Sequence, residues 1–334
     1  MLEKILIAIL IAILIWILKK VFSPFLKKAS EFLEEKRQNS KNAAHDYDTP
    51  YKEHHGQFQV SCIGMEERSL DDVYVAVQFQ NKRRATKYNS IKDVEKAFRK
   101  ESTRHSASTS DERQDGMRVA NNEKYLIVLG SPGGGKSTFL RKIGLEALKG
   151  EDGNFEHQCI PVFLQLRRFP QTPIDIEAWI IEEFKVCGYP HPERWANDKL
   201  KSGGLLILFD GLDEVPKPNV SDVINKIRDF VHQYSQNRFI VSCRTAAYTG
   251  GFTNFAVVEI ADFDDAQIKA YIYNWFASAS NRKMKTAQRC WKALDIREYQ
   301  LAQNPLSLAL LCRVYEDEQN FGPIHPQNLM PPGS

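Results

Sequence analysis

The chain begins with an unbroken apolar segment and then alternates between short apolar runs and charged stretches. Residues Ile5–Leu18 contain no charged side chain. As a helix they would be about 21 Å long, shorter than the roughly 30 Å hydrocarbon core of a bilayer. Lys4 on one side and Lys19 and Lys20 on the other can extend to the lipid headgroups. The pattern therefore predicts a single transmembrane helix over residues 1–20, with the lipid bilayer as a partner.

Two alternatives remain for this apolar segment. A cleaved signal peptide has an apolar region of similar length, but this run ends in two lysines rather than in the small residues of a cleavage site. A buried helix of a soluble domain is the second alternative. Lysine and arginine are more numerous after the segment than before it, which predicts a single-pass membrane protein with its body in the cytoplasm.

Shifts in the pattern also divide the N-terminal third of the chain. Residues 21–50 are charged and polar, which is typical of a juxtamembrane linker. Residues 51–121 predict a small module and a polar linker. Within the module, β-branched and aromatic residues predict two short strands, in residues 56–65 and 70–79.

The remainder of the chain alternates apolar runs of strand type with helical patterns. Residues 122–262 therefore predict an α/β core with a mainly parallel sheet flanked by helices. Residues 263–320 predict a small helical lid domain, and residues 321–334 form a proline-rich tail. The chain of 334 residues is 43% hydrophobic and 26% charged, as expected for a folded protein, and its net charge of +3 gives no strong nucleic-acid signal.

The stretch GSPGGGKST lies between an apolar run and a helical pattern, which predicts strand, loop and helix in that order. Its spacing, GxxxxGKS, is that of the phosphate-binding loop, in which glycines let backbone N–H groups converge on phosphates. Lys136 would then contact the β- and γ-phosphates, and the Ser137 hydroxyl would bind Mg²⁺. The residues predicted to bind nucleotide here are Gly130, Ser131, Pro132, Gly133, Gly134, Gly135, Lys136, Ser137 and Thr138.

A second motif supplies carboxylates for the same site. Asp210 follows the apolar run LLILF, so it is expected at the carboxyl edge of the sheet, where it would bind Mg²⁺ together with Ser137. Asp213 and Glu214 follow closely, and either could be the general base that polarises the attacking water. The alternative for these two residues is an exposed acidic turn before Pro216.

A further strand, rising through FIV, ends at Arg244. A guanidinium at this edge would bind the γ-phosphate strongly, so Arg244 is expected to sense that group. The stretch NKIRD has the wrong spacing for a guanine-binding motif and lies inside a helical pattern. ATP is therefore favoured over GTP.

Six stretches, in order, resemble the NACHT family of signal-transduction ATPases, in the STAND class of P-loop NTPases. They are GSPGGGKSTFLRKI, IPVFLQLRRF, LLILFDGLDEVP, NRFIVSCRTAAY, VVEIADFDDAQIKAYIYNWF and LAQNPLSLALLCRVYED, and they span Tyr125 to Asp317. The resemblance implies roles for Asp210, Asp213, Glu214 and Arg244 in Mg²⁺ binding and catalysis. It also implies that Pro305, in the lid, lies near the adenine.

The resemblance implies a switch in which ADP holds a closed monomer, and ATP opens it and drives homo-oligomerisation with slow hydrolysis. An unknown protein partner or sensor would trigger it, and antiphage defence or a stress response is the expected setting. Family members usually carry a winged-helix domain and a sensor domain after the lid, which we expect this chain to lack. A non-hydrolysing nucleotide-binding membrane scaffold and a truncated regulatory fragment are the alternatives.

Overall fold

The computed structural model describes residues 47–58, 68–80, 113–168, 174–189, 191–277, 281–294 and 296–318. No helix within these ranges is both long enough and apolar enough to cross a membrane. The predicted anchor over residues 1–20, most of the linker after it and the proline-rich tail lie outside the described ranges.

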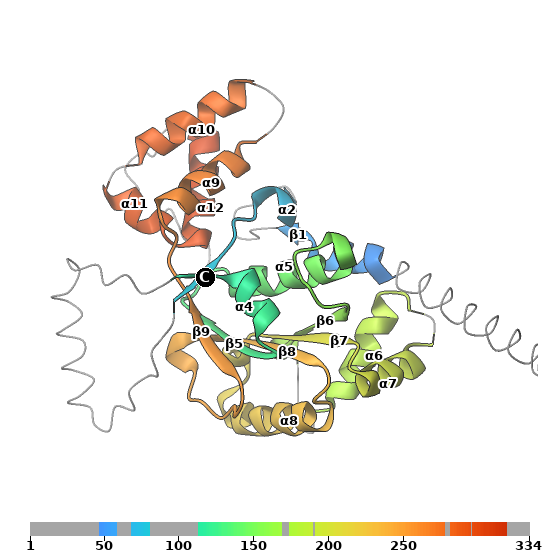
Figure 1. Ribbon diagram of the computed structural model, residues 1–334. Coiled ribbons are helices and arrows are strands. Elements are labelled where there is room, and N and C mark those ends of the chain that lie inside the picture. The colour runs from blue at the N-terminus through green and yellow to red at the C-terminus, as the bar shows by residue number, and fades with distance from the viewer. Residues whose placement is uncertain are drawn as a thin grey trace, which may run out of the picture.

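Within the described ranges, a mixed, mainly parallel sheet of seven strands forms the centre of the fold, in the order β4-β3-β9-β5-β8-β7-β6 (Figure 1). Its strands are β3 (Gln78–Gln80), β4 (Gln114–Asp115), β5 (Tyr125–Gly130), β6 (Ile160–Gln165), β7 (Leu205–Asp210), β8 (Arg238–Arg244) and β9 (Ala256–Ile260). Five of them, from β9 to β6, run parallel to one another, whereas β3 is antiparallel to both of its neighbours. The predicted parallel sheet is confirmed.

Helices cover both faces of this sheet, which explains why its central strands are almost continuously apolar. The helices of this part are α4 (Gly116–Asn122), α5 (Lys136–Leu148), α6 (Ile176–Val186), α7 (Pro192–Ser202) and α8 (Val220–Gln233). Figure 1 shows α5 on one face and α8 on the other. Short 3-10 turns follow three of the strands: η3 (Leu166–Arg168) follows β6, η4 (Leu212–Glu214) follows β7 and η6 (Thr245–Ala247) follows β8. Two further turns flank helices: η2 (Gly150–Asp152) follows α5, and η5 (Lys217–Asn219) precedes α8.

Residues 70–79 form less strand than their pattern predicts, and most of the strand predicted at residues 56–65 lies outside the described ranges. A two-stranded sheet pairs β1 (Gln57–Phe58) with β2 (Arg68–Ser69), and the next residues form the helical turn α2 (Leu70–Val73). The prediction of one strand across residues 70–79 was wrong in its first half. Leu70 and Val73 are three residues apart and both are buried, and in a helical turn that spacing places both side chains on one face.

The described residues of the predicted N-terminal module pack onto the same core as the parallel strands. Residues 47–55 are helical, and Tyr47 and Tyr51 on this helix are fully buried. Residues 47–50, predicted as the end of the linker, thus belong to the folded part instead. The Tyr47 hydroxyl donates a hydrogen bond of 2.7 Å to the carbonyl of Pro161 in β6. At the opposite edge, β3 adds Phe79 to the core and pairs with β9. Over the described residues, the module and the α/β core thus share one hydrophobic interior.

Four helices in the part of residues 263–318 that the structure describes form the lid, which has a hydrophobic core of its own. These helices are α9 (Asp265–Trp275), α10 (Asn281–Ala293), α11 (Ile296–Ala302) and α12 (Pro305–Glu318). Figure 1 shows them together beyond the sheet, with α2 between them and α5. The first lid helix begins at a capping box made by Asp264 and Gln267, which satisfies backbone N–H groups at its start. The helical pattern predicted after residue 263 is confirmed.

Candidate nucleotide site

The predicted phosphate loop lies at the edge of the sheet where the parallel strands end. The strand β5 ends at Gly130 and the helix α5 begins at Lys136, so the predicted order of strand, loop and helix is confirmed. Gly133 and Gly135 have φ angles of +73° and +90°, in the left-handed region that favours glycine. The loop therefore ends at the N-terminus of α5, where backbone N–H groups without helical partners can bind an anion.

Lys136 is folded back over the loop. Its Nζ donates hydrogen bonds to the carbonyls of Gly130 at 3.1 Å and Ser131 at 2.9 Å. Burial lowers the pKa of Lys136 below its usual value, and the nearby charge of Asp213 opposes this lowering. The ammonium group is thereby held beside the loop, where it can contact phosphate oxygens.

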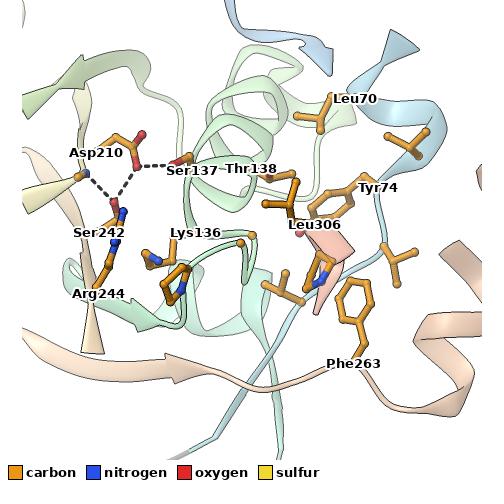
Figure 2. A pocket seen from close by; sticks show the side chains of 18 of the residues that line it. Leu70, Tyr74, Lys136, Ser137, Thr138, Asp210, Ser242, Arg244, Phe263 and Leu306 are labelled. Carbon is orange, nitrogen blue, oxygen red and sulfur yellow. Dashed lines mark hydrogen bonds between the residues drawn. The ribbon is translucent and has the colours of Figure 1, made fainter. Parts of the chain in front are cut away.

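Asp210 lies at the centre of a hydrogen-bond cluster that joins three elements (Figure 2). Its Oδ1 accepts a bond of 2.8 Å from the hydroxyl of Ser137 on α5 and one of 2.7 Å from the hydroxyl of Ser242 on β8. The Ser242 oxygen in turn accepts 2.8 Å from the backbone N–H of Gly211. Ser242 is buried, so this cluster fixes one carboxylate oxygen of Asp210 beside the first turn of α5.

The oxygens of Ser137 and Asp210 fit a magnesium ion. Mg²⁺ prefers hard oxygen ligands and takes only one or two from the protein, with water and phosphate oxygens completing its octahedron. Among the described residues, no group of three or more His, Cys, Asp or Glu side chains is placed to hold a metal ion. Ser137 and Asp210 would hold the ion at the carboxyl edge of the sheet.

Asp213 and Arg244 form an ion pair at the same edge. The Arg244 Nε lies 2.8 Å from Asp213 Oδ2, and the backbone N–H of Arg244 donates 2.8 Å to Asp213 Oδ1. The Asp213 side chain is only 6% exposed, whereas that of Arg244 is 51% exposed. Asp213 therefore has both oxygens engaged, and it orients Arg244 at the mouth of the site.

Glu214 has a different environment from Asp213. It lies at the end of η4, is exposed, and lines the same cavity as Ser137 and Asp210. Gly211 has a φ angle of +81°, and a Cβ at that position would come within 3.1 Å of the Glu214 side chain. The glycine after Asp210 thus leaves room for Glu214 to fold toward the site.

The lid rests directly on the phosphate loop. Asn304 Nδ2 donates 3.0 Å to the carbonyl of Pro132, and the backbone N–H of Leu306 donates 3.2 Å to the carbonyl of Gly133. Asn304 also caps α12, since its Oδ1 accepts from the N–H groups of Leu306 and Ser307. A Cβ on Gly133 would come within 2.8 Å of both Asn304 Oδ1 and Leu306 Cβ. The glycine at 133 is thus required both by its φ angle and by the lid.

A cavity of about 410 Å³ joins these parts, within the range typical of ligand sites. The loop residues in its lining are Pro132, Gly133, Gly135, Lys136, Ser137 and Thr138. Gly130, Ser131 and Gly134 are outside the lining and shape the loop through their backbone hydrogen bonds. Asp210, Asp213, Glu214, Arg244 and Pro305 also line the cavity, so the structure brings the predicted residues to one place.

The other end of the cavity is apolar and was missed from the sequence. Its lining comes from α2 and the chain after it, and from the lid: Leu70, Val73, Tyr74, Val75, Val77, Phe263, Tyr271 and Leu306 (Figure 2). An apolar pocket beside a phosphate loop fits a planar base. The sequence signal was a short apolar run that predicts a strand equally well, and only the tertiary fold places it opposite the loop.

One family model and several solved structures are similar to parts of this chain. Residues 124–279 match the family model of the NACHT domain. No curated protein matches the chain. Among solved structures, AMPPCP-bound DnaA from Aquifex aeolicus is 14% identical with a TM-score of 0.35, and the match covers 61% of this chain and 60% of that one. A RuvB variant from Thermotoga maritima is 12% identical with a TM-score of 0.29, covering 60% and 65%.

PCH-2 from C. elegans is 11% identical with a TM-score of 0.30, and the match covers 70% of each chain. The chain thus spans less than two thirds of the length of the matched DnaA and RuvB. Residues 124–279, which contain the phosphate loop, Asp210 and Arg244, are similar to the NACHT domain.

Proposed function

We propose that this protein is a membrane-anchored ATPase that acts as a nucleotide-dependent signalling switch. One observation carries the proposal: a single cavity joins the phosphate loop, the Asp210 cluster and an apolar pocket, and the lid closes it by bonding directly to the loop at Pro132 and Gly133. A nucleotide in this cavity would touch the core and the lid together. Its phosphates could therefore alter how the lid is held, which is what a switch requires.

Each residue of the site would have a different role in ATP hydrolysis. Lys136 and the N–H groups at the start of α5 would bind the β- and γ-phosphates. Ser137 and Asp210 would hold Mg²⁺, which when bound neutralises charge on these phosphates. Arg244 would contact the γ-phosphate, and Glu214 would orient the attacking water and accept its proton. Hydrolysis is slow in this proposal.

ATP is the proposed nucleotide rather than GTP. The base pocket is lined by aliphatic and aromatic residues of the chain after α2 and of the lid. The NKIRD stretch, Asn225–Asp229, lies inside α8, and none of its residues lines the cavity. An apolar pocket of this kind suits adenine, which presents fewer polar groups than guanine.

The wider role is proposed from the sequence. The apolar segment at residues 5–18 would anchor the chain in the membrane with its NTPase domain in the cytoplasm. ATP binding would drive homo-oligomerisation in response to an unknown protein partner, in a stress response or antiphage defence. Deleting residues 1–20 should move the protein from the membrane fraction to the soluble fraction. If the shortened chain still sediments with membranes, the segment is not the sole attachment.

A non-hydrolysing membrane scaffold is the second candidate. The ion pair between Asp213 and Arg244 favours it, because a guanidinium already paired with a carboxylate would attract a γ-phosphate less strongly. The test is to identify the nucleotide released from protein purified without added nucleotide, and to measure Mg²⁺-dependent phosphate release, with Lys136→Ala as control. Release of ADP or turnover of ATP, both lost in the control, supports the ATPase. Nucleotide binding without turnover supports the scaffold, and binding unaffected by Lys136→Ala contradicts both.

A further inference from the structure

The chain that lines the base pocket is held between two other parts of the protein. We call residues 68–77 the wall segment; it comprises β2, α2 and the residues that lead into β3. Leu70, Val73, Tyr74, Val75 and Val77 of this segment line the cavity. Because the segment is short and mostly non-helical, its position depends on the contacts that it makes on either side.

Arg68 attaches the wall segment to the lid in three ways. Its Nη1 donates 2.7 Å to the carbonyl of Trp275, the last residue of α9. Its Nη2 lies 3.2 Å from both carboxylate oxygens of Glu316 on α12. The guanidinium also stacks over the Trp275 ring, 4.4 Å from its centre. A cation at the carbonyl end of α9 is favoured by the helix dipole, and one side chain thereby connects two lid helices to the wall.

The backbone of the wall segment is bonded to the lid as well. Asn274 Nδ2 donates 3.2 Å to the carbonyl of Tyr74, and Gln267 Nε2 donates 2.7 Å to the carbonyl of Ala76. Both donors lie on α9. Val73 is 2% exposed and belongs to the hydrophobic core of the lid. The wall segment is therefore attached to the lid by charged, polar and apolar contacts together.

On its other side the wall segment is bound to the helix that follows the phosphate loop. Asp71 pairs with Lys142 on α5 and, at 3.5 Å, with Lys149, the residue that follows this helix. Both lysines also lie 2.7 Å from Glu146, whose side chain is only 1% exposed. The same helix carries Lys136 and Ser137 at its start. Asp71 thus fixes the position of the wall segment relative to the phosphate end of the site.

We propose that Arg68 is a positioning residue for bound nucleotide, which latches the wall segment to the lid so that the base pocket is complete only when the lid is closed. This inference rests on the proposed function. A nucleotide would bind the lid-covered phosphate loop with its phosphates and the wall with its base. Base binding and lid closure are then linked, and each favours the other. Arg68 does not line the cavity, so it acts through the wall and not on the nucleotide itself.

The experiment compares two probes: Mg-ATP, which contacts both ends of the site, and Mg-tripolyphosphate, which has no base. Dissociation constants for each are measured by titration calorimetry on the full chain. Arg68→Gln removes the charge and the stacking, and should weaken ATP binding on the order of tenfold, as loss of a charged hydrogen-bond network does. Tripolyphosphate binding should change far less. Arg68→Lys, which keeps the charge at the end of α9, should be intermediate.

Arg313→Gln is the matched control. Arg313 also pairs with Glu316, at 3.5 Å, but its two ion-pair partners, Glu316 and Asp317, both lie on its own helix, α12. It should leave both dissociation constants unchanged. Asp71→Asn tests the other attachment independently of the lid, and should also weaken ATP selectively, so that a poorly folded Arg68 variant would not leave the inference untested.

The outcomes separate this inference from the proposed function. Equal loss of affinity for ATP and tripolyphosphate in Arg68→Gln would overturn the positioning role, because general damage lowers both. ATP binding that is unchanged in both Arg68→Gln and Asp71→Asn would overturn it as well. A native protein that binds neither probe, or binds them regardless of Lys136, would instead contradict the proposed function.

Discussion

Ser137 and Asp210 share a hydrogen bond of 2.8 Å although 73 positions separate them in the chain. Asp210 ends β7, Ser137 lies in the first turn of α5, and β8 lies between β5 and β7 in the sheet. Ser242 on that intervening strand donates to the same oxygen of Asp210. The two proposed magnesium ligands are thus brought together by the fold, and a third residue holds them in register.

Ser242→Ala should weaken the binding of Mg²⁺. The change removes a donor to Asp210 and leaves the buried N–H of Gly211 without its acceptor, which costs about 1–3 kcal/mol in stability. Without that bond Asp210 can rotate, so the Mg²⁺ concentration needed for half-maximal ATP hydrolysis should rise several-fold. Ser242→Thr keeps the hydroxyl and should behave like the native protein. A magnesium titration that is identical in the alanine variant would rule out this role for Ser242.

Glu214 and Asp213 should respond differently to neutralisation. Glu214→Gln should lower turnover by about 10²–10⁴-fold, the usual contribution of a general base, with ATP affinity retained. Asp213→Asn should instead release Arg244, since it removes the charge from an ion pair of 2.8 Å. Single-turnover hydrolysis and nucleotide binding measured in parallel distinguish the two. If Glu214→Gln hydrolyses ATP at the native rate, Glu214 is not the base.

Gly133→Ala should displace the lid. The residue has a φ angle of +73°, and a Cβ there would lie 2.8 Å from Leu306 Cβ and from Asn304 Oδ1. Gly188→Ala is a matched control, since Gly188 has a φ angle of +74° but nothing within 4 Å of an added Cβ. The backbone penalty, about 1 kcal/mol, should therefore be shared by both variants. Only Gly133→Ala should also speed hydrogen exchange in the first turn of α12, and equal exchange in the two variants would contradict a tight lid contact.

Glu146 should make the stability of the protein sensitive to acid. Burial by itself would raise the pKa of Glu146, but hydrogen bonds from Lys142 and Lys149 outweigh it and lower the pKa from 4.5 to about 2. A carboxylate whose pKa is lowered by folding stabilises the folded state at pH values above its pKa in the unfolded chain. This stability, ~3 kcal/mol at most, should be lost as the pH falls from 4.5 toward 2.

Urea unfolding of the native protein and of Glu146→Gln at pH 7 and at pH 3 tests this prediction. The variant should be less stable at pH 7, because its neutral amide cannot pair with the two lysines. Part of this difference should disappear at pH 3. A constant difference at the two pH values would show that Glu146 does not carry the acid sensitivity.

The sequence predicted which residues gather around the phosphate loop, and it did not predict the apolar end of the cavity. Lys136, Ser137 and Asp210 belong to short motifs whose spacing is set by the backbone of one loop or one strand end, so the residues can be read directly. The wall segment has no such spacing. Leu70, Val73 and the residues after them become a binding surface only through contacts with α5 and α9, about 70 and 200 positions away.

The sequence by itself determined which residues could bind phosphate and magnesium, because that chemistry requires glycines, a lysine, a hydroxyl and a carboxylate at fixed local intervals. Tertiary structure alone decided three further points. It engaged Asp213 with Arg244 and left Glu214 exposed in the cavity. It placed Asn304 of the lid on the phosphate loop, and it attached the wall segment to the lid through Arg68. These contacts join segments far apart in the chain, and their geometry follows from packing rather than from local sequence.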